Sequence, residues 1–319
     1  MINKTVVLGG SGVIGHELVK QLSFFDGQVF ATFNETFPGQ IPLTYPSNVH
    51  WIPFPKLEEE WVSTLHDAHT VFHLANKVWN GPRLTKDPSG PINEEKPKNK
   101  LILSQVIRHN VQKFIWVSSS IGYAPGEISS EDNFFTGEVT GRYKTLSDSV
   151  REFEKMLIST ASRNNIDVRV FRPTTIFGRP TRKPANDSHA IVKILDDLVS
   201  VKKTKVFVPE VPRNYIYAPD FATLLQKEWG IKPEKGVCEA YNSRGEGNLT
   251  LSEIALTAVK TLGLSSSSLE FIQSDAIPTL IDLPTEKIKS RISLQQSPLP
   301  TIILEIIQRL QEIEKREKA

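Results

Sequence analysis

Gly9-Gly10-Ser11-Gly12-Val13-Ile14-Gly15 is the stretch that decides the fold, because its glycines stand between a predicted strand, Thr5–Leu8, and a predicted helix, His16–Leu22. In this setting the first glycine permits a tight turn, the second lets a phosphate approach the backbone, and the last lets helix and strand pack closely. The amino end of the helix adds unpaired amides and the positive end of its dipole. We therefore expect a phosphate-binding turn rather than a glycine-rich turn without a ligand.

Short apolar runs of strand character alternate with amphipathic, helical stretches along the first half of the chain. The predicted strands are Thr5–Leu8, Gln28–Thr32, Thr70–Leu74, Lys113–Ser118 and Asp167–Arg172. This alternation predicts an α/β protein, and strands without polar interruptions indicate that helices cover both faces of a parallel sheet. Because the glycine turn follows the first strand, we expect a Rossmann doubly wound parallel sheet that binds a dinucleotide, NAD or NADP.

The chain is also expected to carry a smaller lobe. The dinucleotide-binding Rossmann domain is predicted over residues 1–178, with residues 205–228 returning to it. After Gly178 the sequence becomes irregular and rich in loop residues, so residues 179–204 and 229–319 are assigned to a smaller C-terminal substrate-binding lobe. Apolar residues at helical spacing from Ile302 to Leu310 predict a late helix that docks by one face.

Composition is typical of a globular protein and excludes several classes of partner. The 319 residues are 39% hydrophobic and 23% charged, and 38 basic against 36 acidic side chains give a formal net charge of +2. No basic block stands out, so no nucleic-acid partner is expected. The single cysteine, Cys238, excludes an internal disulfide, and no apolar run approaches the roughly 20 residues that span a membrane. Without a recognisable signal peptide, the expected compartment is the cytoplasm.

The end of the second predicted strand bears on the choice between NAD and NADP. An NAD enzyme usually places an acid there to bind the ribose hydroxyls. Phe33 or Asn34 holds that position here, and Glu35 could serve only if the register shifts. No arginine stands nearby to favour a 2′-phosphate, so both cofactors remain open.

Several later segments, taken in order, resemble one protein family. They are Val71–Asn76, Phe114–Tyr123, Phe171–Gly178, Arg213–Asp220, Ala240–Asn242 followed by Leu249–Ile254, and Pro284–Ile288. Together with the glycine turn they make nearly the whole chain resemble the extended short-chain dehydrogenase/reductase family, of the NAD-dependent epimerase/dehydratase type that acts on nucleotide sugars. The resemblance implies an NAD(P)-dependent oxidoreductase or epimerase. It implies cofactor contacts from Gly9, Ser11, Gly12, Val13, Ile14, Gly15, Asn34, Leu74, Ala75, Asn76, Tyr143, Arg172 and Pro173.

The resemblance further implies a catalytic set made of a hydroxyl residue, a tyrosine, and a lysine four residues after the tyrosine. In that family the hydroxyl holds the substrate oxygen, the tyrosine exchanges its proton as hydride moves, and the lysine grips the nicotinamide ribose and lowers the tyrosine's pKa. Ser119 and Tyr143 are the matching residues. The alternatives are that Ser118–Ser120 merely end a strand and that the tyrosine merely packs at a helix start.

The lysine is the main departure from the family pattern, because Ser147 stands in its place. A tyrosine pKa of about 10 leaves little phenolate near neutrality when no cation is close. Lys144 is a poor substitute, since one step along a helix turns a side chain about 100° away. Two interpretations follow: a working enzyme whose lysine comes from elsewhere or whose ribose is held differently, and an inactive or altered NAD(P)-binding protein that serves as a sensor or partner subunit. The retained Ser119 and Tyr143 favour the enzyme.

Residues beside the catalytic set restrict the reaction that the resemblance implies. Sugar 4,6-dehydratases of this family use an Asp-Glu pair just after the catalytic hydroxyl, where this chain has Ser120 and Ile121. We therefore expect a 4-epimerase or a keto-sugar reductase rather than a 4,6-dehydratase. The expected substrate-binding residues are Ser119, Ser120, Thr175 and Arg213. For the nucleotide diphosphate Arg213 is a stronger candidate than Arg172, which could equally be a strand-end residue with a structural partner.

The sequence also bears on metal binding and on the oligomeric state. His66 and His69 lie three residues apart with no third ligand nearby in the sequence, so no metal is expected. The oligomeric state stays open, although the resemblance implies a homodimer that pairs two long helices, here about Asn99–Asn110 and Tyr143–Asn164.

Overall fold

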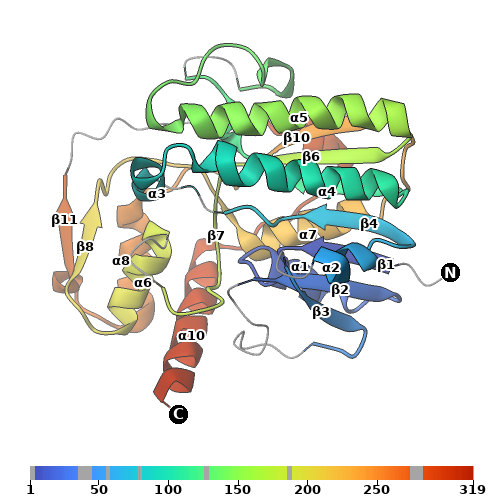
Figure 1. Ribbon diagram of the computed structural model, residues 1–319. Coiled ribbons are helices and arrows are strands. Elements are labelled where there is room, and N and C mark those ends of the chain that lie inside the picture. The colour runs from blue at the N-terminus through green and yellow to red at the C-terminus, as the bar shows by residue number, and fades with distance from the viewer. Residues whose placement is uncertain are drawn as a thin grey trace.

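A seven-stranded parallel sheet forms the centre of the molecule, with strand order β10-β6-β5-β4-β1-β2-β3 (Figure 1). The computed structural model describes residues 4–34, 45–54, 58–77, 79, 81–125, 129–184, 189–273 and 283–318. The strands are β1 Lys4–Leu8, β2 Gln28–Phe33, β3 Val49–Pro53, β4 Ala68–His73, β5 Lys113–Val117, β6 Asp167–Pro173 and β10 Cys238–Ser243. The order reverses between β1 and β4, and such a switch point is where ligands bind in open α/β sheets.

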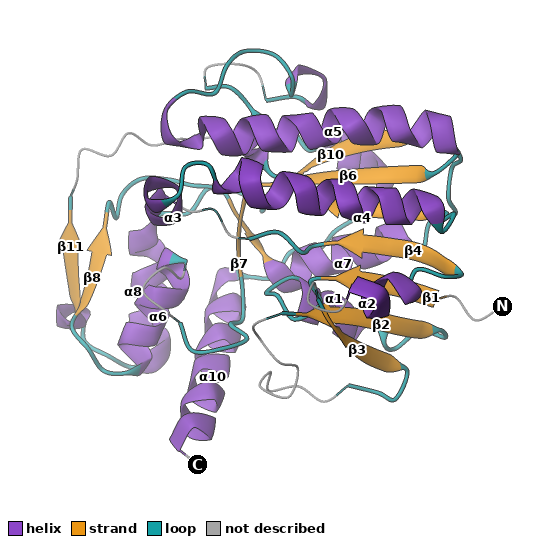
Figure 2. Cartoon of the chain, in the orientation of Figure 1, coloured by secondary structure: helices purple, strands orange, loops and turns teal. Residues whose placement is uncertain are grey.

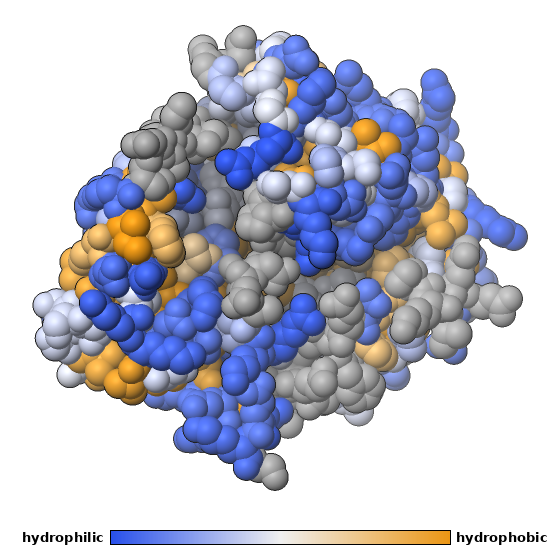
Figure 3. Space-filling model, turned by 60° about the vertical axis from the view of Figure 1, so that its left-hand side comes forward, coloured by the Kyte–Doolittle hydropathy of each residue, from blue (hydrophilic) through white to orange (hydrophobic). Residues whose placement is uncertain are grey.

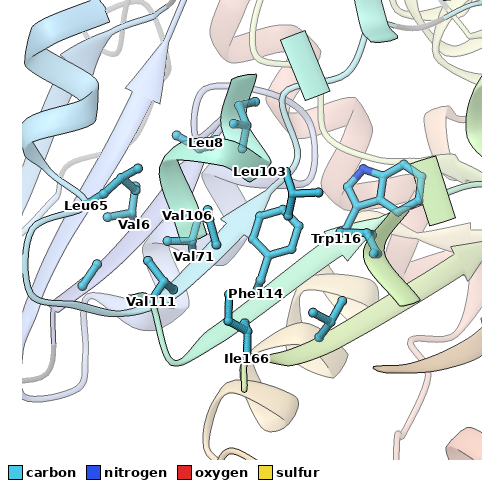
Figure 4. Close-up of a cluster of buried hydrophobic side chains, with 14 of the residues drawn as sticks. Val6, Leu8, Leu65, Val71, Leu103, Val106, Val111, Phe114, Trp116 and Ile166 are labelled. Carbon is cyan, nitrogen blue, oxygen red and sulfur yellow. The ribbon is translucent and has the colours of Figure 1, made fainter. Parts of the chain in front are cut away.

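Helices cover both faces of this sheet (Figure 2). One face carries α2 Glu58–Ser63, α4 Lys96–Arg108 and α5 Lys144–Asn164, and the other carries α1 Gly15–Leu22, α7 Ala218–Trp229 and α9 Glu286–Arg291. Successive side chains of a strand point to opposite faces, so Val6 packs under α4 while Val7 packs under α1. Each face of the sheet thus has its own hydrophobic core. Figure 4 shows the core on the α4 face, in which Val6, Val71 and Phe114 meet side chains of α4.

A smaller lobe stands beside the carboxyl edge of the sheet. It is built from α6 Ala190–Val199, α8 Leu251–Leu262, α10 Leu299–Lys318 and a two-stranded sheet of β8 Thr204–Phe207 and β11 Leu269–Ile272. A second short sheet pairs β7 Thr175–Phe177 with β9 Tyr215–Tyr217 and shares the core of this lobe. Hydrophobic side chains also reach the surface of the molecule (Figure 3). In the lobe, Phe207 on β8 and Phe271 on β11 are exposed.

The predicted fold class is confirmed, since all the expected strands are present and the sheet is parallel and covered on both faces. Two segments differ from the expected division of the chain. β10 belongs to the central sheet, where it pairs with β6, although residues 229–319 are predicted to form the lobe. The sequence does not predict this strand because Cys-Glu-Ala-Tyr-Asn-Ser mixes polar and apolar residues and lacks the signature of a buried strand. β8 lies in the lobe although residues 205–228 were assigned to the Rossmann domain, because Val206 packs in the lobe's core.

Among the described residues no helix is both long enough and apolar enough to cross a membrane.

Candidate active site

The glycine turn after β1 is shaped by close backbone packing. Gly9 has a φ of +86°, and a Cβ there would lie 2.7 Å from the carbonyl carbon of Leu74 and 2.8 Å from the amide nitrogen of Ala75. A Cβ at Gly15 would overlap the carbonyl oxygen of Gly9. Glycine is therefore required at both positions, by backbone conformation at the first and by helix–turn contact at the second.

The outer side of the turn suits a phosphate ligand. A Cβ at Gly12 would meet only the Gly9 carbonyl oxygen, at 3.3 Å, and would otherwise face open space. Gly12 and Val13 are exposed, and the amides of Val13 and Ile14 have no hydrogen-bond partner among the described residues. Helix α1 begins directly afterwards, at Gly15. Free amides, a helix amino end and room above Gly12 are the features that a pyrophosphate requires, so this part of the chain fits the dinucleotide.

Thr32 on β2 holds the turn in place, a role that the sequence did not suggest. Its hydroxyl accepts a hydrogen bond of 2.8 Å from the Gly9 amide, and its carbonyl accepts one of 3.3 Å from the Ser11 amide. Asn34 follows β2 and is exposed near the same edge. Glu35, the alternative reader of the ribose, lies outside the described residues.

The end of β4 meets the glycine turn at the switch point. The Leu74 amide donates a hydrogen bond of 2.8 Å to the Leu8 carbonyl, and Leu74 and Ala75 are half-buried. Asn76 is exposed and donates from its side chain to the Val117 carbonyl, at 3.3 Å. The two segments that were expected to contact the cofactor thus lie against one another, although they are far apart in the sequence.

The serines after β5 face different ways. The Ser118 hydroxyl is buried and donates a hydrogen bond of 2.6 Å to Glu154 on α5. Ser119 is half-buried, and its oxygen accepts a hydrogen bond of 3.2 Å from the Ile121 amide at the start of the 3-10 turn η3, Ser120–Gly122. Of these two hydroxyls, only that of Ser119 keeps its hydrogen for a ligand among the described residues, and its catalytic role stays a prediction. Ser120 is nearly buried.

Tyr143 ends the short turn η5, Gly141–Tyr143, and caps the amino end of α5. It is half-buried, and the Arg142 guanidinium lies 5.7 Å from the centre of its ring. Lys144 is directed elsewhere, into ion pairs with Glu138 at 3.0 Å and Asp148 at 3.2 Å. As helix geometry suggested, Lys144 does not take the place of the missing lysine.

Arg172 corrects one expectation. The sequence placed it among the cofactor contacts, but its side chain is 2% exposed and forms an ion pair of 2.6 Å with the buried Glu154. It also donates to the Tyr123 hydroxyl at 3.1 Å and stacks on the Phe134 ring at 3.7 Å. These partners occupy the guanidinium of Arg172. The structure therefore agrees with the alternative that Arg172 is a strand-end residue with a structural partner.

The remaining expected contacts lie between the sheet and the lobe. Pro173 ends β6 and is buried, whereas Thr175 on β7 is exposed. Arg213 precedes β9 and is exposed, and its backbone is fixed by hydrogen bonds of 2.9 Å in both directions with Leu249. Its side chain has no hydrogen-bond or ion-pair partner among the described residues, which leaves its guanidinium available to an anionic ligand.

The histidines take part in local contacts. His66 pairs with Asp67 at 2.7 Å, and His69 contacts the Thr70 hydroxyl at 2.9 Å. The described residues contain no group of three or more histidine, cysteine, aspartate or glutamate side chains that could hold a metal ion.

Solved structures with the same architecture come from several microorganisms. An epimerase from Methanothermobacter thermautotrophicus has a TM-score of 0.81 and 16% identity, over 99% of this chain and 95% of that one. UDP-glucuronic acid 4-epimerase from Bacillus cereus, in complex with NAD, has a TM-score of 0.74 and 19% identity, over 97% and 99%. dTDP-glucose 4,6-dehydratase from Bacillus anthracis, also with NAD, has a TM-score of 0.73 and 16% identity, over 99% and 98%. At these identities the likeness shows the fold.

A search of curated protein sequences found no match. The family model described as "NAD dependent epimerase/dehydratase family" matches residues 5–227, which include the glycine turn, Ser119, Tyr143 and Arg213. This match confirms the family resemblance, an enzyme rather than a binding protein as the class, and a nicotinamide dinucleotide as cofactor. The chain therefore belongs to the NAD-dependent epimerase/dehydratase family.

Proposed function

We propose that this protein transfers hydride reversibly between a nicotinamide dinucleotide and a nucleotide sugar, as a 4-epimerase or a keto-sugar reductase. The observation that carries the proposal is the retention of Ser119 and Tyr143 at the carboxyl edge of a sheet whose glycine turn fits a pyrophosphate. The Ser119 hydroxyl can still donate a hydrogen bond to a ligand, and Tyr143 lies at the amino end of α5 with its side chain half-exposed.

Each residue has a separate task in this proposal. When bound at the glycine turn, the nicotinamide dinucleotide would supply the hydride chemistry of the site. The Ser119 hydroxyl donates a hydrogen bond to the oxygen of the reacting carbon, while the Tyr143 phenol gives or takes the proton of that oxygen. Arg213 holds the diphosphate of the substrate, since guanidinium groups match phosphate oxygens well. Because the proton and the hydride leave from or arrive at the same carbinol, an alcohol and a ketone are interconverted.

The residues after Ser119 argue against dehydration. Removal of water from a keto-sugar needs an acid and a base at two further carbons, and neither Ser120 nor Ile121 has a carboxyl group. Ser120 is also 8% exposed, which leaves little of it to meet a substrate. Ketone and alcohol chemistry at one carbon is what the site supports best.

The test is turnover of a panel of UDP- and dTDP-sugars with NAD or NADP. Tyr143→Phe should lower kcat by about 10²- to 10⁴-fold, the usual contribution of a proton-transfer group, and Ser119→Ala should also lower kcat. Tyr241→Phe is the matched control, because its hydroxyl bonds Arg169 at 3.3 Å in the interior of the protein. Unchanged turnover in Tyr143→Phe would contradict the proposal. A parent protein that binds the dinucleotide but converts no sugar would favour a sensor or partner subunit.

A further inference from the structure

Helix α5 lacks a cation at the position where the family has its lysine. Ser147 there is completely buried, and its hydroxyl has no partner among the described residues. The helix packs at this end against the π-helical segment η2, Pro91–Glu95, and against α4, which follows it. Ser149 donates a hydrogen bond of 3.0 Å to the Pro91 carbonyl, and Lys96 pairs with Glu152 at 2.9 Å. Figure 1 shows α4 and α5 side by side, so α4 is placed to supply a side chain that α5 lacks.

Lys98 on α4 points to the sheet beneath it. Its ammonium group donates to the Ala75 carbonyl and to the Glu95 carboxylate, the latter at 2.5 Å. The next residue, Asn99, is anchored in the same place, since its side-chain oxygen lies 2.8 Å from Nε2 of the buried His73. The first turn of α4 is therefore fixed over the carboxyl end of β4.

The carbonyl that Lys98 binds belongs to the switch point itself. Gly9 packs closely against Ala75, because a Cβ on Gly9 would lie 2.8 Å from the amide nitrogen of Ala75. The ammonium of Lys98 is thus one residue away from the phosphate-binding turn, in the crevice where a dinucleotide lies in this class of fold. A cation in that crevice would lie beside the polar, phosphate- and ribose-containing part of a bound dinucleotide.

Glu95 keeps the lysine in this position. The Glu95 side chain is buried, and besides Lys98 it accepts a hydrogen bond of 3.1 Å from the Lys77 amide and one of 3.4 Å from the Trp79 indole. Burial lowers the pKa of Lys98, while the neighbouring carboxylate of Glu95 counteracts this and favours the charged form. Lys98 is 20% exposed, and only two of its three ammonium hydrogens have partners among the described residues. One donor remains for a ligand.

We propose that Lys98 supplies from α4 the ribose-holding cation that α5 lacks at Ser147, by donating its remaining hydrogen to a hydroxyl of the nicotinamide-side ribose. The inference rests on the dinucleotide site of the proposed function but is independent of which sugar is converted. The family's lysine has two tasks, and the proposal assigns to Lys98 the one of holding the ribose. Ser147, the α5 residue at the family's lysine position, is too short for this task and carries no charge.

Calorimetry with AMP, ADP, ADP-ribose and NAD tests the proposal, because only the last two carry the second ribose. Lys98→Met should weaken ADP-ribose and NAD by about tenfold to a hundredfold, the range for a hydrogen bond to a charged group, and leave AMP and ADP unchanged. Lys100→Met is the matched control, since it removes an exposed lysine from the same helix. Ser147→Lys in the Lys98→Met background should restore part of the lost affinity, because it returns a cation from α5.

A second variant guards against misfolding, because Lys98→Met leaves the buried Glu95 without its cation. Combining Lys98→Met with Glu95→Gln removes both charges and keeps an acceptor for Lys77 and Trp79. If ADP-ribose binds these variants as tightly as the parent, or if AMP and ADP lose as much affinity as ADP-ribose, Lys98 does not hold the ribose. A parent that binds none of the four ligands would overturn the proposed function as well, which separates the two failures.

Discussion

At position 12 the absence of a side chain decides whether the glycine turn can accept a pyrophosphate. Gly12→Val places a branched side chain above the turn, and within 4 Å its Cβ would meet only the Gly9 carbonyl oxygen, at 3.3 Å. The fold should survive, whereas dinucleotide affinity should fall at least a hundredfold, as measured by calorimetry beside a circular dichroism spectrum. Gly230→Val is a matched control, since a Cβ there meets only the Lys227 carbonyl oxygen at 3.5 Å, far from the turn. A Gly12→Val protein with the parent's affinity would show that the pyrophosphate binds elsewhere.

Asn34 would decide the preference between NAD and NADP if its side chain binds the hydroxyls of the adenosine ribose. An amide carries no charge, so the parent should discriminate only weakly between NAD and NADP. Asn34→Asp introduces a carboxylate that binds ribose hydroxyls and repels a 2′-phosphate, and should shift the ratio of the two dissociation constants toward NAD by about tenfold or more. Asn164→Asp, at the exposed end of α5, controls for the added charge. A parent that already prefers NAD a hundredfold would contradict this prediction and direct attention to Glu35.

Between elements, the ion pair of Glu154 and Arg172 joins α5 to β6 beneath Ser118. Arg172→Met leaves a buried carboxylate without its cation and should lower the free energy of unfolding by about 3 to 5 kcal/mol. Adding Glu154→Gln should recover part of this loss, because the uncompensated charge is gone. Urea denaturation at pH 7 measures both effects. Calorimetry should show that any folded Arg172→Met protein binds dinucleotide like the parent, and a selective loss of affinity would return Arg172 to the cofactor site.

Elements with strong local patterns could be predicted from the sequence, and contacts between elements could not. β1, β4 and β5 each contain an unbroken apolar run, Val6–Leu8, Val71–Phe72 and Phe114–Val117, as expected of strands buried on both faces of a sheet. β10 was not predicted as a strand, because it is an edge strand that mixes polar and apolar residues and pairs on one side only. Its place in the sheet depends on β6 rather than on its own composition.

The candidate site divides in the same way. The glycine turn, Ser119 and Tyr143 follow from spacing along the chain. Thr32 and Lys98 were missed because each acts on a residue more than twenty positions away, and nothing in their own neighbourhood marks them. Arg172 was assigned to the cofactor because an arginine at a strand end suits a phosphate equally well, and only the position of Glu154 on α5 decides between the two partners.

Across the whole molecule, Arg179 links the Rossmann sheet to the smaller lobe beside the glycine turn. Its guanidinium donates to both carboxylate oxygens of Glu17 on α1, one of them at 2.6 Å, and lies 3.5 Å from Glu305 on α10. Glu305 in turn accepts a hydrogen bond of 2.8 Å from the Tyr217 hydroxyl of β9. Helices from the two parts of the protein therefore share one charged cluster, next to the place where the pyrophosphate is expected.

This cluster predicts how the stability of the protein depends on pH. Burial raises the pKa of Glu17, but hydrogen bonds and positive charge from His16 and Arg179 outweigh burial and lower it to about 2. A carboxyl whose pKa is lower in the folded than in the unfolded state stabilises the fold above its unfolded pKa. From an ordinary 4.5 to about 2, the contribution is about 3 kcal/mol, present at neutral pH and lost as the pH falls between those values.

Glu17→Gln isolates this contribution. The variant should be less stable than the parent at pH 7 by up to about 3 kcal/mol, and the difference should shrink as the pH falls from 4.5 toward 2, because the parent loses the same charge there. Urea denaturation at pH 7, 4.5 and 3 measures the two curves. Glu210→Gln, at an exposed position, is the matched control and should run parallel to the parent. If Glu17→Gln also runs parallel to the parent at all three values, Glu17 does not couple α1 to Arg179, and the connection between sheet and lobe depends on apolar packing instead.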